Sequence, residues 1–301
     1  MTAPPRALRL RGELVELGGP RPWVMGIVNA TPDSFSDGGL RQTLDERVSL
    51  AAELLAAGAD VIDIGGESGV TNRPAVSAEE EISRVVPLIR EVAGSLGGRV
   101  SVDTYKPAVA KAAIDAGASI VNDVSGLLDL GLADVCAATG AALVIMHTRA
   151  TPKQKLHDPS LDGRVVGDVI TFLRERVSVA LERGVALEQL ILDPGPDFGK
   201  TPAQTIDVLR ALPELHAFER PLLLAASRKD FVGALTGRGP RERLAGTLAA
   251  VGYGVDAGVH ILRVHDVLEV EDFLTVREAL TGLLDVDRDL RVDDAVRWDQ
   301  G

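Results

Sequence analysis

Eight short apolar runs recur along the chain, and their alternation with longer amphipathic segments constrains the fold more than any other feature. Continuous apolar runs of this length are typical of strands buried on both faces of a parallel sheet. The segments between them read as amphipathic helices. The runs lie at 23–28, 61–64, 99–102, 119–121, 142–146, 190–192, 221–226 and 259–264. The pattern therefore predicts eight strand-then-helix units.

Local signals mark several of the predicted helices. Ser77 and Glu80 resemble a capping box ahead of apolar residues at helical spacing, and Pro107 suits the first turn of a helix that ends at Gly117. Further helices are predicted over 43–57, 131–139, 165–183, 202–211, 240–257 and 267–283. Each of them follows one of the apolar runs.

The simplest fold for eight such units in a chain of 301 residues is an α/β fold of the (β/α)8 TIM barrel type. Residues 7–17 roughly alternate apolar and polar side chains around Gly12, which predicts an N-terminal β-hairpin that covers the bottom of the barrel. A doubly wound sheet is the alternative, but NATPDSFSDGG after the first run does not fit its glycine-rich turn. We expect a hairpin extension at 1–22, the barrel at 23–284 and an acidic C-terminal tail at 285–301.

The charge and cysteine content argue against several classes of protein. A formal net charge of −12 argues against unaided binding to nucleic acid or to an anionic membrane. The single cysteine, Cys136, rules out an internal disulfide framework and is predicted to be a small core residue. The N-terminal segment has no sustained apolar region, and no apolar stretch approaches ~18 uninterrupted residues. We therefore expect a soluble cytoplasmic protein.

The carboxyl ends of all strands in a (β/α)8 barrel meet at one mouth, where active sites are built. In this sequence hydrogen-bonding side chains follow every predicted strand. The residues at the strand ends are Asn29; Glu67 and Ser68; Asp103 and Thr104; Asn122 and Asp123; Met146 and His147; Asp193; Ser227, Arg228 and Lys229; and Arg263, His265 and Asp266. A purely structural protein has no reason to place such groups at all eight positions, so the pattern predicts an enzyme.

Four of these residues form a first set: Asp103, Asn122, Asp193 and Lys229. Their carboxylate, amide and ammonium groups could bracket a flat heterocycle that carries both donors and acceptors. The alternative is structural, with the two aspartates orienting backbone amides or pairing with Lys229.

A second set, Asn29, Arg263 and His265, suits an anion such as phosphate or pyrophosphate. The first and last strands are neighbours in a closed barrel, and Arg263 and His265 lie on the same side of one strand. No H-x-x-x-H motif or cysteine cluster indicates a metal site. A Mg²⁺ ion held by substrate phosphates and one or two protein oxygens is an open alternative.

Seven motifs occur in order between about Val24 and about Leu283 and resemble one known family. They are MGIVNATPDSFSDGG, DIGGES, SVDTYKP, IVNDVSG, DPGPDFGKT, ASRKDF and RVHDV. Together they resemble the dihydropteroate synthase family, the pterin-binding barrel transferases of folate biosynthesis. The resemblance implies that 6-hydroxymethyl-7,8-dihydropterin pyrophosphate reacts with para-aminobenzoate, with Mg²⁺ as cofactor, in a cytoplasmic enzyme that is commonly a homodimer.

The resemblance also assigns roles by motif. Asp103, Asn122, Asp193 and Lys229 would hold the pterin ring, and Met146 would line its pocket. Asn29, Arg263 and His265 would hold pyrophosphate, with Asn29 also binding the metal. Asp33, Phe35 and Ser36 would help close the site, Ser227 would lie near the para-aminobenzoate carboxylate, and Phe198 and Arg73 would also bind substrate. The catalytic group would be Asp33, Lys229, Arg263 and His265.

Three segments depart from the family pattern. DIGGES is usually followed by Thr-Arg-Pro-Gly, whereas this chain continues with residues 69–74, GVTNRP, which displaces Arg73 along the loop. Pro196 and Asp197 replace an apolar-glycine pair and place a charge near the predicted pterin site. MHTRATPKQK adds Arg149, Lys153 and Lys155 to the fifth loop, where they either face the mouth or are solvated.

The altered second loop leaves a second functional hypothesis open. In the family this loop shapes the para-aminobenzoate site. The alternative is therefore a diverged pterin-binding paralogue that uses a different acceptor or has no synthase activity.

Overall fold

The computed structural model describes residues 2–31, 43–67, 74–154, 158–293 and 297 of the 301-residue chain. Eight parallel strands form one sheet in the order β8-β7-β6-β5-β4-β3-β10-β9, and a bridge between Leu192 and Leu222 joins β8 to the β9 end. The predicted (β/α)8 barrel is therefore confirmed. Its strands are β3 (Trp23–Asn29), β4 (Val61–Gly65), β5 (Arg99–Asp103), β6 (Ile120–Asp123), β7 (Ala142–Met146), β8 (Leu190–Asp193), β9 (Leu223–Leu224) and β10 (Ile261–Val264).

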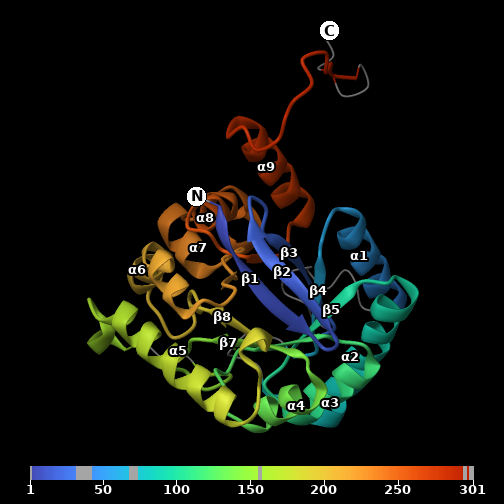
Figure 1. Cartoon of the computed structure of the whole chain (residues 1–301), viewed down its shortest axis with the longest axis vertical. Coiled ribbons are helices and arrows are strands. Elements are labelled where there is room, and N and C mark those ends of the chain that lie inside the picture. Colours follow the sequence, from blue (N-terminus) through green and yellow to red (C-terminus); the bar gives the residue numbers. More distant parts are fainter. Residues whose placement is uncertain (1, 32–42, 68–73, 155–157, 294–296, 298–301) are drawn as a thin grey trace.

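Helices surround the strands as an outer ring (Figure 1). They are α1 (Leu44–Ala56), α2 (Ala78–Arg90), α3 (Pro107–Ala116), α4 (Gly131–Thr139), α5 (Val165–Glu182), α6 (Pro202–Arg210), α7 (Asp230–Thr236), α8 (Leu244–Asp256) and α9 (Val267–Leu280). A π-helical turn, η1 (Glu91–Ser95), continues α2. Short 3-10 turns are η2 (Pro159–Leu161), η3 (Leu187–Gln189), η4 (Leu212–Phe218) and η5 (Pro240–Glu242).

Two predictions about the helices need correction. The predicted helix over 240–257 is divided, because η5 is a separate 3-10 turn and α8 begins only at Leu244. Of the two hydrogen bonds of the predicted capping box at Ser77, only one forms. Ser77 accepts from the backbone N–H of Glu80, but the Glu80 side chain pairs with Arg84 instead of reaching back to the cap.

The predicted N-terminal hairpin consists of β1 (Ala3–Leu10) and β2 (Glu13–Gly19), which pair antiparallel. The hairpin lies across one end of the barrel (Figure 1). Its Leu8 and Leu17 are fully buried in an apolar cluster with Met25 and Ile261 from the barrel strands. The backbone N–H of Arg11 also donates to the Gly140 carbonyl. The hairpin therefore closes the amino-terminal end of the barrel and leaves the carboxyl ends of the strands for the site.

The inward-facing side chains change from apolar to polar along the strands. Near the amino ends they belong to the same apolar cluster as the hairpin. Nearer the carboxyl ends, the register between strands sets Asp103 beside Asn122 and Met146 beside Asp193. Period-two alternation thus brings residues from different strands into one polar layer on the barrel axis.

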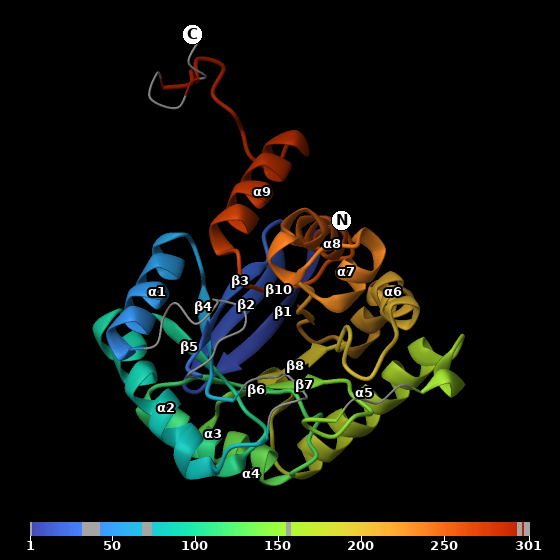
Figure 2. The same ribbon diagram turned by 180° about the vertical axis from the view of Figure 1, so that it is seen from behind.

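The end of the chain leaves the barrel after α9 (Figure 2). Residues 281–293 are exposed along their whole length.

Cys136 lies in the core, as predicted. Among the described residues no helix combines the length and apolar character needed to cross a membrane.

Candidate active site

Arg263 is the central cation of the barrel mouth. Its Nε lies 2.6 Å from Asp63 Oδ2, and one of its terminal nitrogens lies 2.8 Å from Asp103 Oδ2. Asn122 Nδ2 donates to the same Asp63 oxygen at 3.2 Å. Strands β10, β4, β5 and β6 thus each contribute one side chain to a single hydrogen-bonded group.

This geometry corrects the prediction of two separate residue sets. Arg263 was assigned with Asn29 and His265, but its guanidinium contacts Asp103 of the first set. The physical reason is that long inward side chains meet across the axis of a closed barrel. A buried guanidinium then takes the nearest carboxylates as partners.

Asp63 was missed in the sequence. It lies inside the apolar strand VIDIG and not at its end, yet its side chain is fully buried and faces the barrel axis. A carboxylate in the middle of a buried strand is itself a signal, because such a group needs a cation or donor nearby. Its Oδ1, and the Oγ of its cross-strand neighbour Ser101, have no hydrogen-bond partner within the described part of the chain. Unused hydrogen-bonding capacity beside the axis is expected where a polar ligand binds.

The pKa of Asp103 is raised to about 7, mainly because burial disfavours the charged carboxylate; Arg263 opposes this effect and Asp63 adds to it. The unfolded chain has an ordinary aspartate pKa near 4. Between these values the folded protein holds a proton that the unfolded chain has lost. The contribution of Asp103 to stability is therefore complete below about pH 4 and is lost as the pH rises through about 7.

The direction of this pH dependence gives a testable expectation. In Asp103→Asn, the fall in melting temperature between pH 4 and pH 7 should be smaller than in the unsubstituted protein, since asparagine does not titrate. The measurement is thermal unfolding followed by circular dichroism at each pH. Parallel pH profiles for the two proteins would show that Asp103 titrates as it does in the unfolded chain.

Lys229 lies on the other side of the mouth, where it directly precedes α7. Its Nζ is 4.1 Å from the centroid of the Phe198 ring, a cation–π contact. Burial lowers the pKa of Lys229, and the charges of Asp197 and Asp193 oppose that shift. Asp193 is held by its own loop, because its Oδ1 accepts from the Gly195 N–H at 2.7 Å. The first predicted set therefore does gather around the mouth.

His265 and Ser227 form a second polar pair. The Ser227 Oγ lies 3.0 Å from His265 Nδ1 and also accepts from the His265 backbone N–H. Since the serine proton is then free to go to Nδ1, the imidazole carries its proton on Nε2. Burial lowers the pKa of His265 to about 3, assisted by Arg228 and Arg263. His265 is thus a neutral hydrogen-bond donor at physiological pH and not a cation.

Asn29 faces the same opening across Gly65. A side-chain carbon placed on Gly65 would lie 3.8 Å from Asn29 Oδ1 and 3.6 Å from Asp103 Cβ. Glycine at this position leaves a gap between the amide oxygen and the carboxylate. Met146 of β7 is buried on the opposite side of the barrel from Asn29 of β3, where it pairs in register with Asp193.

Some polar strand ends have structural tasks instead. Asp123 accepts hydrogen bonds from backbone N–H groups of its own loop. His147 lies 2.7 Å from Lys200 Nζ, and burial, followed by the charge of Lys200, lowers its pKa to about 3. Arg228 pairs with Asp266 at 3.0 Å. Four further predicted site residues, Asp33, Phe35, Ser36 and Arg73, lie outside the described residues.

A family model described as "Pterin binding enzyme" matches residues 25–265, which is most of the chain. The chain belongs to the pterin-binding enzyme family. It is 41% identical over 258 residues to the dihydropteroate synthase of Escherichia coli, covering 86% of this chain and 91% of that protein. A solved Xanthomonas albilineans dihydropteroate synthase with 4-aminobenzoic acid superimposes with a TM-score of 0.84 at 40% identity, covering 92% of this chain and 99% of that one. The same enzyme in complex with 7,8-dihydropteroate gives a TM-score of 0.80 at 40% identity, covering 91% and 98%.

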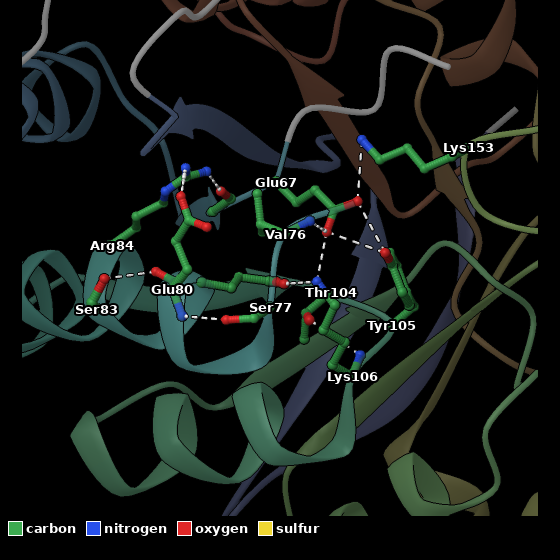
Figure 3. Close-up of polar contacts among 12 residues, drawn as sticks. Glu67, Val76, Ser77, Glu80, Ser83, Arg84, Thr104, Tyr105, Lys106 and Lys153 are labelled. Carbon is green, nitrogen blue, oxygen red and sulfur yellow. Dashed lines mark hydrogen bonds and ion pairs between the residues drawn. The ribbon is translucent and has the colours of Figure 1, made fainter. Parts of the chain in front are cut away.

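One loop network of this pterin-binding enzyme could not be predicted from the motifs (Figure 3). The Glu67 carboxylate accepts from Tyr105 Oη at 2.9 Å and from Lys106 Nζ at 2.5 Å, and it pairs with Lys153 Nζ at 3.1 Å. It also accepts from the backbone N–H of Val76 at 3.3 Å. These contacts join the segments that follow β4, β5 and β7.

The network decides between two interpretations of the basic fifth loop. Lys153 is only 15% exposed and reaches Glu67, so it is not solvated. Arg149 turns toward α5, where it forms an ion pair with Asp168 at 2.5 Å. Lys155 lies outside the described residues. Of the described basic residues in this loop, only Lys153 joins the mouth-side network.

Proposed function

We propose that this chain catalyses the reaction of a dihydropteroate synthase. The enzyme would condense 6-hydroxymethyl-7,8-dihydropterin pyrophosphate with para-aminobenzoate to give 7,8-dihydropteroate and pyrophosphate. The observation that carries the proposal is the gathering of Asp103, Asn122, Asp193 and Lys229 in one barrel mouth, in a chain 41% identical to a dihydropteroate synthase.

The polar layer suits the pterin ring. A pterin has an edge of alternating donors and acceptors, which carboxylates, an amide and an ammonium group can match. Asp103, Asn122 and Asp193 would serve the donor and acceptor atoms of the ring, and Lys229 would donate to a ring acceptor. The raised pKa values of Asp103 and Asp193, which arise mainly from burial, make a ligand that donates hydrogen bonds favourable there.

Arg263 and His265 would act on the leaving group. The amine of para-aminobenzoate attacks the pterin methylene carbon, the carbon–oxygen bond to pyrophosphate breaks, and pyrophosphate leaves with the electron pair. The amine then loses its extra proton. Arg263 would supply positive charge and His265 a neutral N–H donor where negative charge develops. Arg263 would remain anchored by Asp63 at 2.6 Å while it does so.

Magnesium is proposed as the cofactor. Within the described chain no group of three or more His, Cys, Asp or Glu side chains is arranged to hold a metal ion. The Asn29 amide oxygen beside the Gly65 gap fits a hard cation that takes its other ligands from pyrophosphate and water. When bound, the ion would neutralise charge on the leaving pyrophosphate.

Removal of divalent ions tests this proposal. Chelation with EDTA is expected to slow pyrophosphate release roughly tenfold or more, and added Mg²⁺ should restore the rate. In Asn29→Ala a higher Mg²⁺ concentration should be needed for half of the maximal rate. Full activity in EDTA would contradict a metal requirement.

A homodimer is also proposed, with exposed apolar residues of α8 and α9 at its interface. Val251 of α8 is 1% exposed in the core, so it cannot form an interface. Tyr253 of α8 and Leu268, Val276 and Leu280 of α9 are exposed apolar side chains that would favour association. Sedimentation equilibrium would distinguish a dimer from a monomer.

We place the enzyme in the cytoplasm, in line with a single cysteine that is free and buried.

Product analysis tests the proposed activity. Mass spectrometry of a reaction with both substrates is expected to detect 7,8-dihydropteroate in amounts equal to the pyrophosphate released. Tight binding of the pterin substrate with no dihydropteroate would instead support the alternative of a pterin-binding paralogue.

A further inference from the structure

Asp197 departs from the family pattern, and its side chain is turned away from the barrel axis. Its backbone has a φ of 65°, in the left-handed region. The buried Thr205 Oγ1 accepts from the Asp197 backbone N–H at 3.1 Å and donates to Asp197 Oδ1 at 3.1 Å. The loop after β8 is therefore fixed to α6 at this residue.

The second carboxylate oxygen of Asp197 crosses to another loop. Asp197 Oδ2 accepts from the backbone N–H of Phe231 at 3.2 Å, two residues after Lys229. Lys229 is the residue that precedes the first turn of α7, and its own side chain makes no capping hydrogen bond. Asp197, from another loop, thus makes the N-capping hydrogen bond that the side chain of a serine or aspartate at position 229 would make. This leaves the ammonium group of Lys229 free to face the mouth.

The neighbouring residue contacts the other end of Lys229. The Phe198 ring lies 4.1 Å from Lys229 Nζ. Two consecutive residues of the loop after β8 therefore fix Lys229. Asp197 holds the backbone just after Lys229, and Phe198 contacts the ammonium group of Lys229. We propose that Asp197 is a positioning residue for Lys229, which it holds in place and supplies with a nearby negative charge. The inference rests on the proposed function only for the substrate that Lys229 would bind.

The electrostatics around Lys229 agree with this arrangement. Burial is the largest influence and lowers the pKa of Lys229, and Asp197 is the leading charge that opposes it. The other charged or titratable groups that face Lys229 are Asp193, Arg263, Asp103, Lys200 and His265. Loss of the Asp197 charge should therefore lower the pKa of Lys229 further, so that the ammonium group loses its proton at a lower pH.

Two substitutions separate charge from structure. Asp197→Asn removes the charge, keeps an oxygen for the Phe231 N–H and offers an amide donor to Thr205. Asp197→Gly removes both side-chain contacts, while the backbone N–H of residue 197 can still donate to Thr205 Oγ1. Asparagine and glycine both tolerate a positive φ, so neither variant adds backbone strain. Asp207→Asn is the matched control, because Asp207 lies on α6 near Thr205 but is 45% exposed.

The primary measurement is the NMR titration of the lysine side chains in the protein without ligand. The chain has only six lysines, and Lys229→Arg identifies the Lys229 signal. We expect Lys229 to titrate at lower pH in Asp197→Asn and in Asp197→Gly, and at an unchanged pH in Asp207→Asn. In Asp197→Asn, affinity for the dihydropterin substrate should fall about tenfold at alkaline pH, where Lys229 loses its proton, and much less at acid pH.

An unchanged Lys229 titration in both Asp197 variants would overturn the inference, even if Asp197→Gly melts at a lower temperature. That outcome would leave Asp197 as a structural residue only. If Asp197→Gly folds poorly, Asp197→Asn still reports the loss of charge. Because the titration needs neither substrate nor turnover, it is independent of the proposed function. An inactive protein with a shifted Lys229 titration would refute the synthase and keep the inference.

Discussion

Arg263→Ala is expected to lower the free energy of unfolding by about 3–5 kcal/mol at neutral pH, because it leaves buried carboxylates without their cation. Asp63 is fully buried and Asp103 is three-quarters buried, and Arg263 donates to both. Substrate turnover should also be lost, since the same guanidinium would face the leaving group. The hydrogen bond to Asp103 means that pterin binding should weaken as well.

The stability deficit of Arg263→Ala should depend on pH. Arg263 opposes the upward shift of the Asp103 pKa, so its removal raises that pKa above about 7. The deficit should therefore shrink as the pH falls below 7 and the carboxyl takes up a proton. Adding Asp63→Asn to Arg263→Ala should recover part of the lost stability, because it removes one uncompensated charge.

Urea unfolding at pH 5 and pH 8 measures these differences. Arg183→Ala is a suitable control, since Arg183 pairs with Asp134 at 2.8 Å and both side chains are about half exposed. That surface pair should contribute less than about 1 kcal/mol. A deficit for Arg263→Ala as small as that of the control would show that the central ion pair does not stabilise the barrel.

Lys229→Ala is expected to weaken binding of the pterin substrate by about 1.5–3 kcal/mol, or roughly 10- to 140-fold. The loss follows because a buried ammonium group near Asp193 and Phe198 would no longer donate to the ring. Lys229→Arg should recover binding only in part, since a guanidinium is longer and planar.

Calorimetry with the pterin substrate measures this loss directly. Lys111→Ala provides the matched control, because Lys111 is 54% exposed and pairs along its own helix with Asp115. Its removal should leave pterin affinity unchanged. Equal affinities for Lys229→Ala and the unsubstituted protein would place the pterin ring elsewhere.

The fold was predictable because the strands are buried on both faces and therefore appear as continuous apolar runs. The alternation with helices then leaves few topologies, and the barrel is confirmed. α7 was missed for a physical reason. It has seven residues, too few to show a helical period, and its cap comes from Asp197 in another loop.

The candidate site was predictable only where polar residues lie at a strand end or in the segment that follows it. Asp103, Asn122 and Asp193 lie at the ends of their strands, Lys229 follows β9 at the start of α7, and the four gather at the mouth as expected. Partnerships across the barrel were not predictable, because they depend on side-chain reach in three dimensions. The Arg263 contacts with Asp63 and Asp103 and the Lys153 contact with Glu67 are of this kind.

The most direct test of the proposed synthase is pyrophosphate release from 6-hydroxymethyl-7,8-dihydropterin pyrophosphate in Mg²⁺, with and without para-aminobenzoate. We predict release that depends on para-aminobenzoate and that is lost in Lys229→Ala. Release at the same rate without the amine, or none at all from a protein that binds the pterin tightly, would contradict the proposed function.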